Sequence, residues 1–369
     1  MRLADSEISG WIAEWSRRRP DKLVLRFEDR ETSYGAMERR VARLAGALAG
    51  AGIDDGDRVA YLGGNAPELL DLLLACARVG AILVPLSARM PAPELEVVLA
   101  NTEPEAVVAE AAFAETASAA GSSLGLRVIA FGHEDGAGSL PALLAQAPEL
   151  RHDPDRDTRA RHGRDRDAAA RVRTGRDAGA DREPQITLAI ATPAMTKALI
   201  SDPGWETTDL SSLRCVITGS TTVREDVLAP WFERGVRVLQ DYGLTEAMPV
   251  VTIVSLDDAH RLRATAGRPL PHCSVRIAAE DGSPVESGEV GEVLVKGPTV
   301  MPEYWRNAEA TRKAFHEGGW LRTGDAGVID AEGILSIASS RSSSSAATTC
   351  IPPTSSRCWQ TVRVSRNSP

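Results

Sequence analysis

Residues 151 to 182 cannot contribute to a hydrophobic core. They hold ten Arg and seven Asp but no Leu, Ile, Phe, Met, Trp or Tyr. The little apolar surface they could bury does not offset about 1.5 kcal/mol per residue of ordering entropy, so we expect this stretch to be disordered. The Ser-, Thr- and Arg-rich tail, residues 339 to 369, shows neither helical nor strand periodicity, and we expect the same of it. Folded cores must come from the other parts of the chain.

The block before the Arg/Asp-rich stretch alternates strands and helices. The runs KLVLRFED, DRVAYLGG and AILVPL read as strands. Residues 32 to 52 have apolar side chains at helical spacing, with Thr32 or Ser33 as the N-cap and Gly50 or Gly52 at the end. A second helix has Pro67 in its first turn and Gly80 after its end. This alternation predicts an α/β fold, with a parallel sheet and helices on both of its faces.

A second block starts at ITLAIATPAMTKALI and continues through the strands LRCVITGS and VRVLQDYG. From about Leu256, short strands separated by glycines predict a small barrel-like β subdomain. We therefore divide the chain into five parts. These are an N-terminal α/β subdomain (1–150), the Arg/Asp-rich segment (151–185), a second α/β subdomain (186–255), the β subdomain (256–338) and the tail (339–369).

Composition excludes several classes of protein. A net charge of −9 argues against broad attraction to nucleic acid or to anionic membranes. The five cysteines are scattered without a CxxC pair, so neither a disulfide framework nor a zinc site is indicated. No stretch reaches about 18 apolar residues, and the N-terminus does not resemble a signal peptide. We expect a cytoplasmic protein without a transmembrane segment.

The stretch VLQDYGLTEAMP combines side chains suited to a nucleotide and a metal ion. The aromatic face of Tyr242 can stack on adenine, and Gly243 lets the backbone approach a ligand closely. The hydroxyl of Thr245 can hydrogen-bond a phosphate. The carboxylate of Glu246 is the hard oxygen ligand that Mg²⁺ prefers.

These residues resemble the Tyr-Gly-x-Thr-Glu motif of the adenylate-forming superfamily, which includes acyl-CoA synthetases, aryl-CoA ligases, luciferases and peptide-synthetase adenylation domains. ITGSTTV resembles the Gly-rich loop that lines the family's adenine and acyl site. GWLRTGDAGVID resembles its Trp-x-x-Thr-Gly-Asp segment, in which Asp325 would accept both ribose hydroxyls. AGRPLP and GEVGEVLVKGPTVMPEYW fall in family order between these motifs, with Glu303 where a glycine is usual. The resemblance covers residues 10 to 110 and 186 to 337.

The resemblance implies a set of site residues and an activity. Thr245 and Glu246 would be the catalytic residues, with Glu246 also the metal ligand. The nucleotide would be bound by Gly219, Ser220, Thr221, Gln240, Asp241, Tyr242, Gly243 and Asp325. The implied reaction activates a carboxylic acid with ATP to acyl-AMP and then transfers the acyl group to coenzyme A, so ATP or AMP, Mg²⁺ and coenzyme A are the expected cofactors. Because ATPAMTKALI and AMPVV are apolar, we expect a fatty acid as the substrate.

Two parts of the family pattern are missing from the sequence. The family's phosphate loop is a Ser/Thr/Gly-rich run that ends in a lysine and cradles the β and γ phosphates. No such run occurs here, since Lys197 lies in an apolar helix and Lys22 at the start of a strand. The family's C-terminal domain, with its late lysine, is also not matched, and the surroundings of Arg341 do not fit the hinge pattern. We expect a truncated protein in which adenylation is impaired.

A shift of reading frame can explain the two unusual segments. Read from the third base of each codon, the tail run SSSSAATTCIPPTSSRCWQTV permits VIISGDNVHPADVEQVLADG, which is very like the segment after the hinge in acyl-CoA synthetases. Read from the second base, DAAARVRTGRDAGADREPQ permits MLPRGFEPVEMLGLIANHR, although this test is more permissive. The hypothesis is a gene that lost a stretch including the phosphate loop and changed frame near both segments.

Four interpretations remain open at this point. The chain is an active acyl-CoA ligase, a non-catalytic remnant that binds AMP or an acyl-adenylate, or a product that does not fold. The fourth interpretation, an Arg-rich nucleic-acid arm, is disfavoured because Asp interleaves with Arg and no aromatic side chain is available for stacking.

Overall fold

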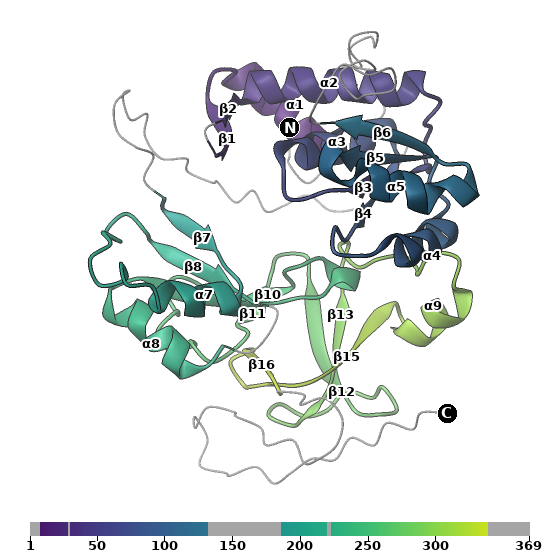
Figure 1. Ribbon diagram of the computed structural model, residues 1–369. Helices are drawn as coiled ribbons and strands as arrows, with labels where there is room; N and C mark the ends of the chain where they lie inside the picture. Colours follow the sequence, from purple (N-terminus) through teal and green to yellow (C-terminus); the bar gives the residue numbers. More distant parts are fainter. Residues whose placement is uncertain (1–7, 29, 132–185, 220–222, 339–369) are drawn as a thin grey trace. The chain divides into compact units, whose positions relative to one another are not determined.

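The computed structural model describes residues 8–28, 30–131, 186–219 and 223–338 (Figure 1). The segment 151–185 and the tail 339–369, for which we predicted disorder and altered frames, lie outside the described residues. The chain divides into two compact units, Met1–Thr174 and Gly175–Pro369, and each is described by itself. No helix among the described residues is both long enough and apolar enough to cross a bilayer.

The first unit begins with α1 (Ile8–Arg18), a hairpin of β1 (Leu23–Phe27) and β2 (Arg30–Ser33), and the long helix α2 (Tyr34–Gly50). The prediction that KLVLRFED enters the parallel sheet is wrong, because β1 pairs antiparallel with β2, its one partner strand among the described residues. The reason is local. The chain reverses directly after Phe27, where Glu28 has a φ of 52°, and no helix is available to carry it to a parallel neighbour.

A four-stranded parallel sheet forms the centre of this unit, and its order is β4-β3-β5-β6. Its elements are β3 (Arg58–Leu62), α3 (Pro67–Val79), β4 (Ile82–Leu86), α4 (Ala92–Thr102), β5 (Ala106–Glu110), η2 (Ala111–Phe113), α5 (Ala114–Gly121), η3 (Ser122–Leu124) and β6 (Arg127–Phe131). The predicted α/β fold with a parallel sheet is confirmed.

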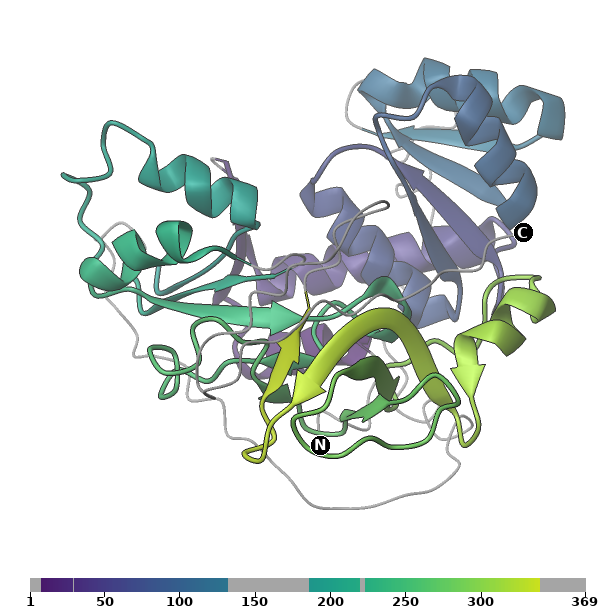
Figure 2. The ribbon, with the colours of Figure 1, turned by 90° about the horizontal axis from the view of Figure 1, so that it is seen from below.

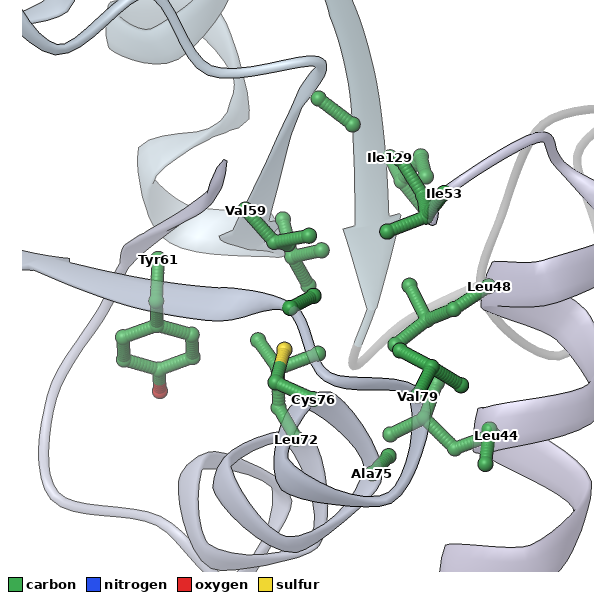
Figure 3. Packing of buried hydrophobic residues seen from close by; sticks show 14 of the residues in the cluster. Leu44, Leu48, Ile53, Val59, Tyr61, Leu72, Ala75, Cys76, Val79 and Ile129 are labelled. Atoms are coloured by element: carbon green, nitrogen blue, oxygen red, sulfur yellow. The ribbon is translucent and has the colours of Figure 1, made fainter. Parts of the chain in front are cut away.

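Successive side chains of β3 enter two different cores. Val59 and Tyr61 pack with side chains of α2 and α3, and Figure 3 shows this cluster with Leu48 and Leu72 around it. Ala60 and Leu62 face the opposite way, toward α4 and α5. This alternation places helices on both faces of the sheet, as predicted.

The helix ends follow the predicted signals. The side chain of Ser33 caps α2 by accepting a hydrogen bond from the Ala36 amide at 3.3 Å, so Ser33 rather than Thr32 is the N-cap. Gly80 ends α3 in the left-handed conformation with a φ of 82°, and its amide donates to the Cys76 carbonyl.

Tyr61 allows a test of this core. The side chain is 2% exposed, its hydroxyl donates to the Gly64 carbonyl at 3.0 Å, and burial raises its pKa from 10.0 to about 12. Because the pKa is higher in the folded state, the stability linked to Tyr61 is present below about pH 10 and is lost as the pH rises through about 12. An ultraviolet titration of the native protein should show a phenolate step near pH 12 whose amplitude Tyr61→Phe lowers by one tyrosine. An unchanged amplitude in the folded variant would contradict the assignment.

The second unit contains a five-stranded sheet in the order β11-β10-β9-β8-β7. Its elements are β7 (Leu188–Ile190), α7 (Pro193–Ile200), β8 (Cys215–Thr218), α8 (Glu225–Glu233), β9 (Arg237–Tyr242), η5 (Thr245–Ala247), β10 (Thr252–Ile253) and β11 (Arg268–Pro269). Strands β7, β8 and β9 are parallel, and Trp231 of α8 packs with Val216 and Val238 on one face. At the β7 edge, Leu188 is 49% and Ile190 is 76% exposed.

The remainder of the second unit is an antiparallel half-barrel in the order β12-β13-β15-β14, with β16 also paired to β15. Its elements are β12 (Ser274–Ala278), β13 (Gly291–Lys296), α9 (Ala308–Ala314), β14 (Phe315–His316), β15 (Trp320–Ile329) and β16 (Leu335–Ile337). Figure 2 shows the strong curvature of the long strand β15, drawn in yellow-green. This confirms the predicted small barrel-like part. The five-part division of the chain stays a prediction. Strand β11 belongs to the five-stranded sheet of the second unit, although it lies beyond residue 255, where we placed a boundary.

Candidate functional site

Two predicted glycines lie where the parallel strands of the second unit end. Gly219 follows β8 directly, and Thr218 is the register partner of Gln240 on β9. The backbone of Gly219 lies so close to Asp241 that an added Cβ would stand 1.9 Å from Oδ1 of that side chain and 2.9 Å from the backbone carbonyl oxygen of the same residue. Only glycine therefore fits beside Asp241, and the structure brings these two predicted residues together at the carboxyl edge of the sheet, where α/β folds bind ligands.

Gly243 makes a second close approach. An added Cβ there would lie 2.1 Å from the carbonyl oxygen of Pro249, because the chain turns back after η5 and the Val251 amide donates to the Tyr242 carbonyl at 2.7 Å. Ala247 of the turn is fully buried in the core of the half-barrel. The turn that carries Thr245 and Glu246 is thus fixed from both sides.

Tyr242 and Asp325 meet although 83 positions separate them in the sequence. The hydroxyl of Tyr242, at the end of β9, donates to Oδ2 of Asp325, within β15, at 2.8 Å. The Asp325 amide donates to Oγ1 of Thr323 at 3.1 Å, and that hydroxyl donates to the Val293 carbonyl at 2.8 Å. The structure therefore joins the two motifs that the sequence predicted to bind the adenosine part of the nucleotide.

Glu246 has a partner that the sequence did not predict. The hydroxyl of Tyr304 donates to Oε1 of Glu246 at 2.9 Å, and the Met301 amide donates to the Glu246 carbonyl at 2.8 Å. The first contact orients the carboxylate through Oε1 and the second holds the backbone of Glu246, so Oε2 could serve as a metal ligand. No local sequence signal could have identified Tyr304, because 58 positions separate it from Glu246.

The other predicted residues occupy different surroundings. The Gln240 side chain is 6% exposed, accepts from the Val223 amide at 3.2 Å and donates to the Arg263 carbonyl, so both of its polar ends are used inside the protein. Thr245 is exposed at the first position of η5. Ser220 and Thr221 lie outside the described residues.

Two ionisable side chains of the site, Asp241 and Tyr242, are shielded from water by burial. Burial raises the pKa of Asp241 above its usual range, and burial likewise raises the pKa of Tyr242. The hydrogen bond to Glu246 raises the pKa of Tyr304. Both tyrosines therefore remain protonated hydrogen-bond donors at neutral pH, each aimed at a carboxylate.

Comparison with known proteins decides the family. The model of a family described as AMP-binding enzyme matches residues 12–170 and 171–305. The chain belongs to the AMP-binding enzyme family. It is 33% identical to the indoleacetate–CoA ligase of Aromatoleum aromaticum, an alignment that covers 89% of this chain and 77% of the relative. It is 27% identical to the long-chain-fatty-acid–CoA ligase FadD13 of Mycobacterium tuberculosis, over 84% of this chain and 73% of the relative.

The fold matches solved structures of the AMP-binding family. The N-terminal domain of FACL13 from Mycobacterium tuberculosis superposes with a TM-score of 0.74 at 24% sequence identity, covering 90% of this chain and 100% of that one. At this level of identity the likeness shows the fold. The family model and the relatives confirm the resemblance to acyl-CoA synthetases of the adenylate-forming superfamily, and the residues assigned to the site remain predictions.

Proposed function

We propose that this member of the acyl-CoA ligase family binds AMP or an acyl-adenylate at the edge formed by Gly219, Asp241, Tyr242 and Asp325. The observation that carries the proposal is the 2.8 Å hydrogen bond between Tyr242 and Asp325, which joins two motifs from distant parts of the sequence. The Asp325 carboxylate would accept from the ribose hydroxyls, the ring of Tyr242 would contact adenine, and Thr245 would contact the phosphate.

Glu246 suits a magnesium ion that is held mainly by phosphates. Among the described residues there is no group of three or more His, Cys, Asp or Glu side chains that could hold a metal ion by itself. A site with one carboxylate oxygen, Oε2 of Glu246, fits Mg²⁺, which commonly binds through one or two carboxylates plus substrate phosphates and water. Bound there, the ion would neutralise phosphate charge.

We further propose that formation of the adenylate from ATP is impaired. The sequence has no Ser/Thr/Gly-rich run ending in lysine, and the alignment with the indoleacetate–CoA ligase runs over 395 residues, more than the 369 in this chain. The relative therefore has residues within the aligned stretch that this chain lacks, which supports the hypothesis of a lost segment. The alternative is a catalytically active ligase that transfers the acyl group to coenzyme A.

The class of acid is the finer part of the proposal. The apolar runs near the site favour a fatty acid, and FadD13 is named as a long-chain-fatty-acid–CoA ligase. The more similar relative is named for indoleacetate, an aromatic acid. Both acids have an apolar body, so we propose an apolar monocarboxylic acid and retain a fatty acid as the first candidate.

Isothermal titration calorimetry tests the binding function. The full chain would be titrated with AMP and with non-hydrolysable acyl-sulfamoyl adenosines carrying a dodecanoyl or an indoleacetyl group. We expect measurable binding that Asp325→Ala weakens about 10- to 100-fold, since hydrogen bonds to charged groups contribute roughly 1.5–3 kcal/mol. The matched control is Asp257→Ala, which removes an exposed carboxylate of the same unit. Absence of heat with all three ligands on folded protein would refute the proposal, and the stronger of the two analogues identifies the acid class.

A further inference from the structure

Two residues singled out for separate contacts with a nucleotide are in fact joined to each other. We predicted from the sequence that Tyr242 acts through its ring and Asp325 through its carboxylate. The structure uses the phenol hydroxyl as a donor to Oδ2 of Asp325 at 2.8 Å. We propose that Tyr242 is a positioning residue whose hydroxyl fixes the Asp325 carboxylate for the ribose diol, an inference that rests on the proposed nucleotide site.

Hydrogen bonds also hold the backbone of Asp325 in place. The Asp325 amide donates to Thr323 Oγ1, and the Thr323 hydroxyl donates to the Val293 carbonyl of the neighbouring strand β13. Gly324 lies between Thr323 and Asp325 with a φ of 73°, and its amide donates to Oε1 of Glu292 at 3.1 Å. The backbone at Asp325 is therefore set by β13, and the remaining freedom is the rotation of the carboxylate itself. The Tyr242 hydroxyl restricts that rotation.

The remaining capacity of the carboxylate matches a diol. An ionised carboxylate offers about four acceptor positions on its two oxygens. The Tyr242 hydroxyl uses one position on Oδ2 and leaves Oδ1 and part of Oδ2 for two further donors. Two neighbouring ribose hydroxyls are such donors, and their bonds to a charged acceptor are strong only when the carboxylate plane is correctly oriented.

The Tyr242 ring and hydroxyl can be separated experimentally. The ring packs against the half-barrel core that contains Ala247 and Val251. A phenylalanine keeps this packing and any contact with adenine, but it has no donor for Asp325. Tyr242→Phe therefore keeps the ring and removes the hydroxyl, with its donation to Asp325 and its contact with Thr323.

Calorimetry with two nucleotides tests the inference. The full chain, Tyr242→Phe, Asp325→Asn and the double variant would each be titrated with AMP and with 2′,3′-dideoxy-AMP. We expect Tyr242→Phe to bind AMP about tenfold more weakly and dideoxy-AMP within about twofold of the unchanged chain, because only AMP has hydroxyls that depend on the oriented carboxylate. Adding Tyr242→Phe to Asp325→Asn should cause little further loss of AMP affinity. Tyr61→Phe, which removes the same group from the first unit, should leave both affinities unchanged.

Each other outcome has a defined meaning. An equal loss for both nucleotides, or no loss for AMP, overturns the positioning role while leaving the nucleotide site intact. An unchanged chain that binds neither AMP nor the acyl-adenylate analogues overturns the proposed function and this inference together. If Tyr242→Phe does not fold, 3-fluorotyrosine at position 242 replaces it. Its fluorine resonance should shift in Asp325→Asn, and a resonance that does not respond contradicts the hydrogen bond on which the inference depends.

Discussion

ATP–pyrophosphate exchange by the full chain, with either dodecanoate or indoleacetate, is expected to be no faster than exchange by its Glu246→Ala variant. Adenylation requires groups that neutralise the charge developing on the triphosphate. Loss of a single group placed for this purpose typically costs about 2.7–4 kcal/mol, or roughly 10²- to 10³-fold in rate. A chain without the family's phosphate loop lacks several such donors at once, so we expect a rate at background level.

The distribution of lysines supports this expectation. The sequence contains four, and the structure describes all of them. Lys22 lies 5.7 Å from the ring of Trp15 in the first unit, and Lys313 forms a 2.7 Å ion pair with Glu309. Lys296 lies 6.0 Å from the ring of Trp320, and Lys197 is an exposed residue of α7. None of them stands at the end of a glycine-rich loop.

The exchange assay has a clear positive control. The FadD13 ligase with the fatty acid and the indoleacetate–CoA ligase of Aromatoleum aromaticum with indoleacetate, both assayed in parallel with labelled pyrophosphate, test whether the conditions support the reaction. Acid-dependent exchange by this chain above the level of Glu246→Ala would show that other basic groups replace the phosphate loop. That result would refute the proposal that adenylation is impaired. Binding of AMP would not be affected by that result, because it depends on a different set of residues.

Glu38→Ala is expected to reduce the free energy of unfolding of the first unit by about 3–5 kcal/mol. Glu38 accepts from both terminal nitrogens of Arg78, at 2.9 and 2.8 Å, and the Arg78 side chain is only 3% exposed. Removing the carboxylate takes two charge-assisted hydrogen bonds away from a buried guanidinium. Amide hydrogen exchange in β3 and β5, followed at increasing urea concentration, reports on this unit separately from the other.

Glu31→Ala is the matched control in the same unit. Glu31 pairs with Arg26 on the β1–β2 hairpin, but both side chains are about half exposed. An exposed ion pair contributes about 0–1 kcal/mol, so this variant should change little. If the two substitutions lower the free energy of unfolding equally, burial does not determine how much the Arg78–Glu38 pair contributes to stability.

Local sequence signals predicted the helix ends and the parallel sheet of the first unit. Ser33 and Gly80 marked helix ends because an N-cap hydroxyl and a left-handed glycine act within a few residues. Alternating strands and helices identified the parallel sheet for the same reason. The prediction for KLVLRFED failed because the periodicity of a strand does not specify its partner, and β2 follows it too closely for a crossover.

The candidate site was predictable as a set of residues but not as an arrangement. Motif order identified Tyr242, Glu246 and Asp325. The contacts that orient the two carboxylates cross 83 and 58 positions of sequence, and they depend on how the half-barrel packs against the turn after β9. That packing is a tertiary property, so the role of Tyr304 and the second role of Tyr242 could be found only in the structure.

The short edge strand β7 has a practical consequence for handling the protein. Within the part of the chain that the structure describes, its only partner is β8, so its outer backbone groups face away from the sheet, next to the exposed side chains of Leu188 and Ile190. An apolar edge of this kind is a template for strands of other molecules. Aggregation during concentration and storage should therefore begin at β7, and a lysine in place of Ile190 would raise the concentration at which the protein stays in solution.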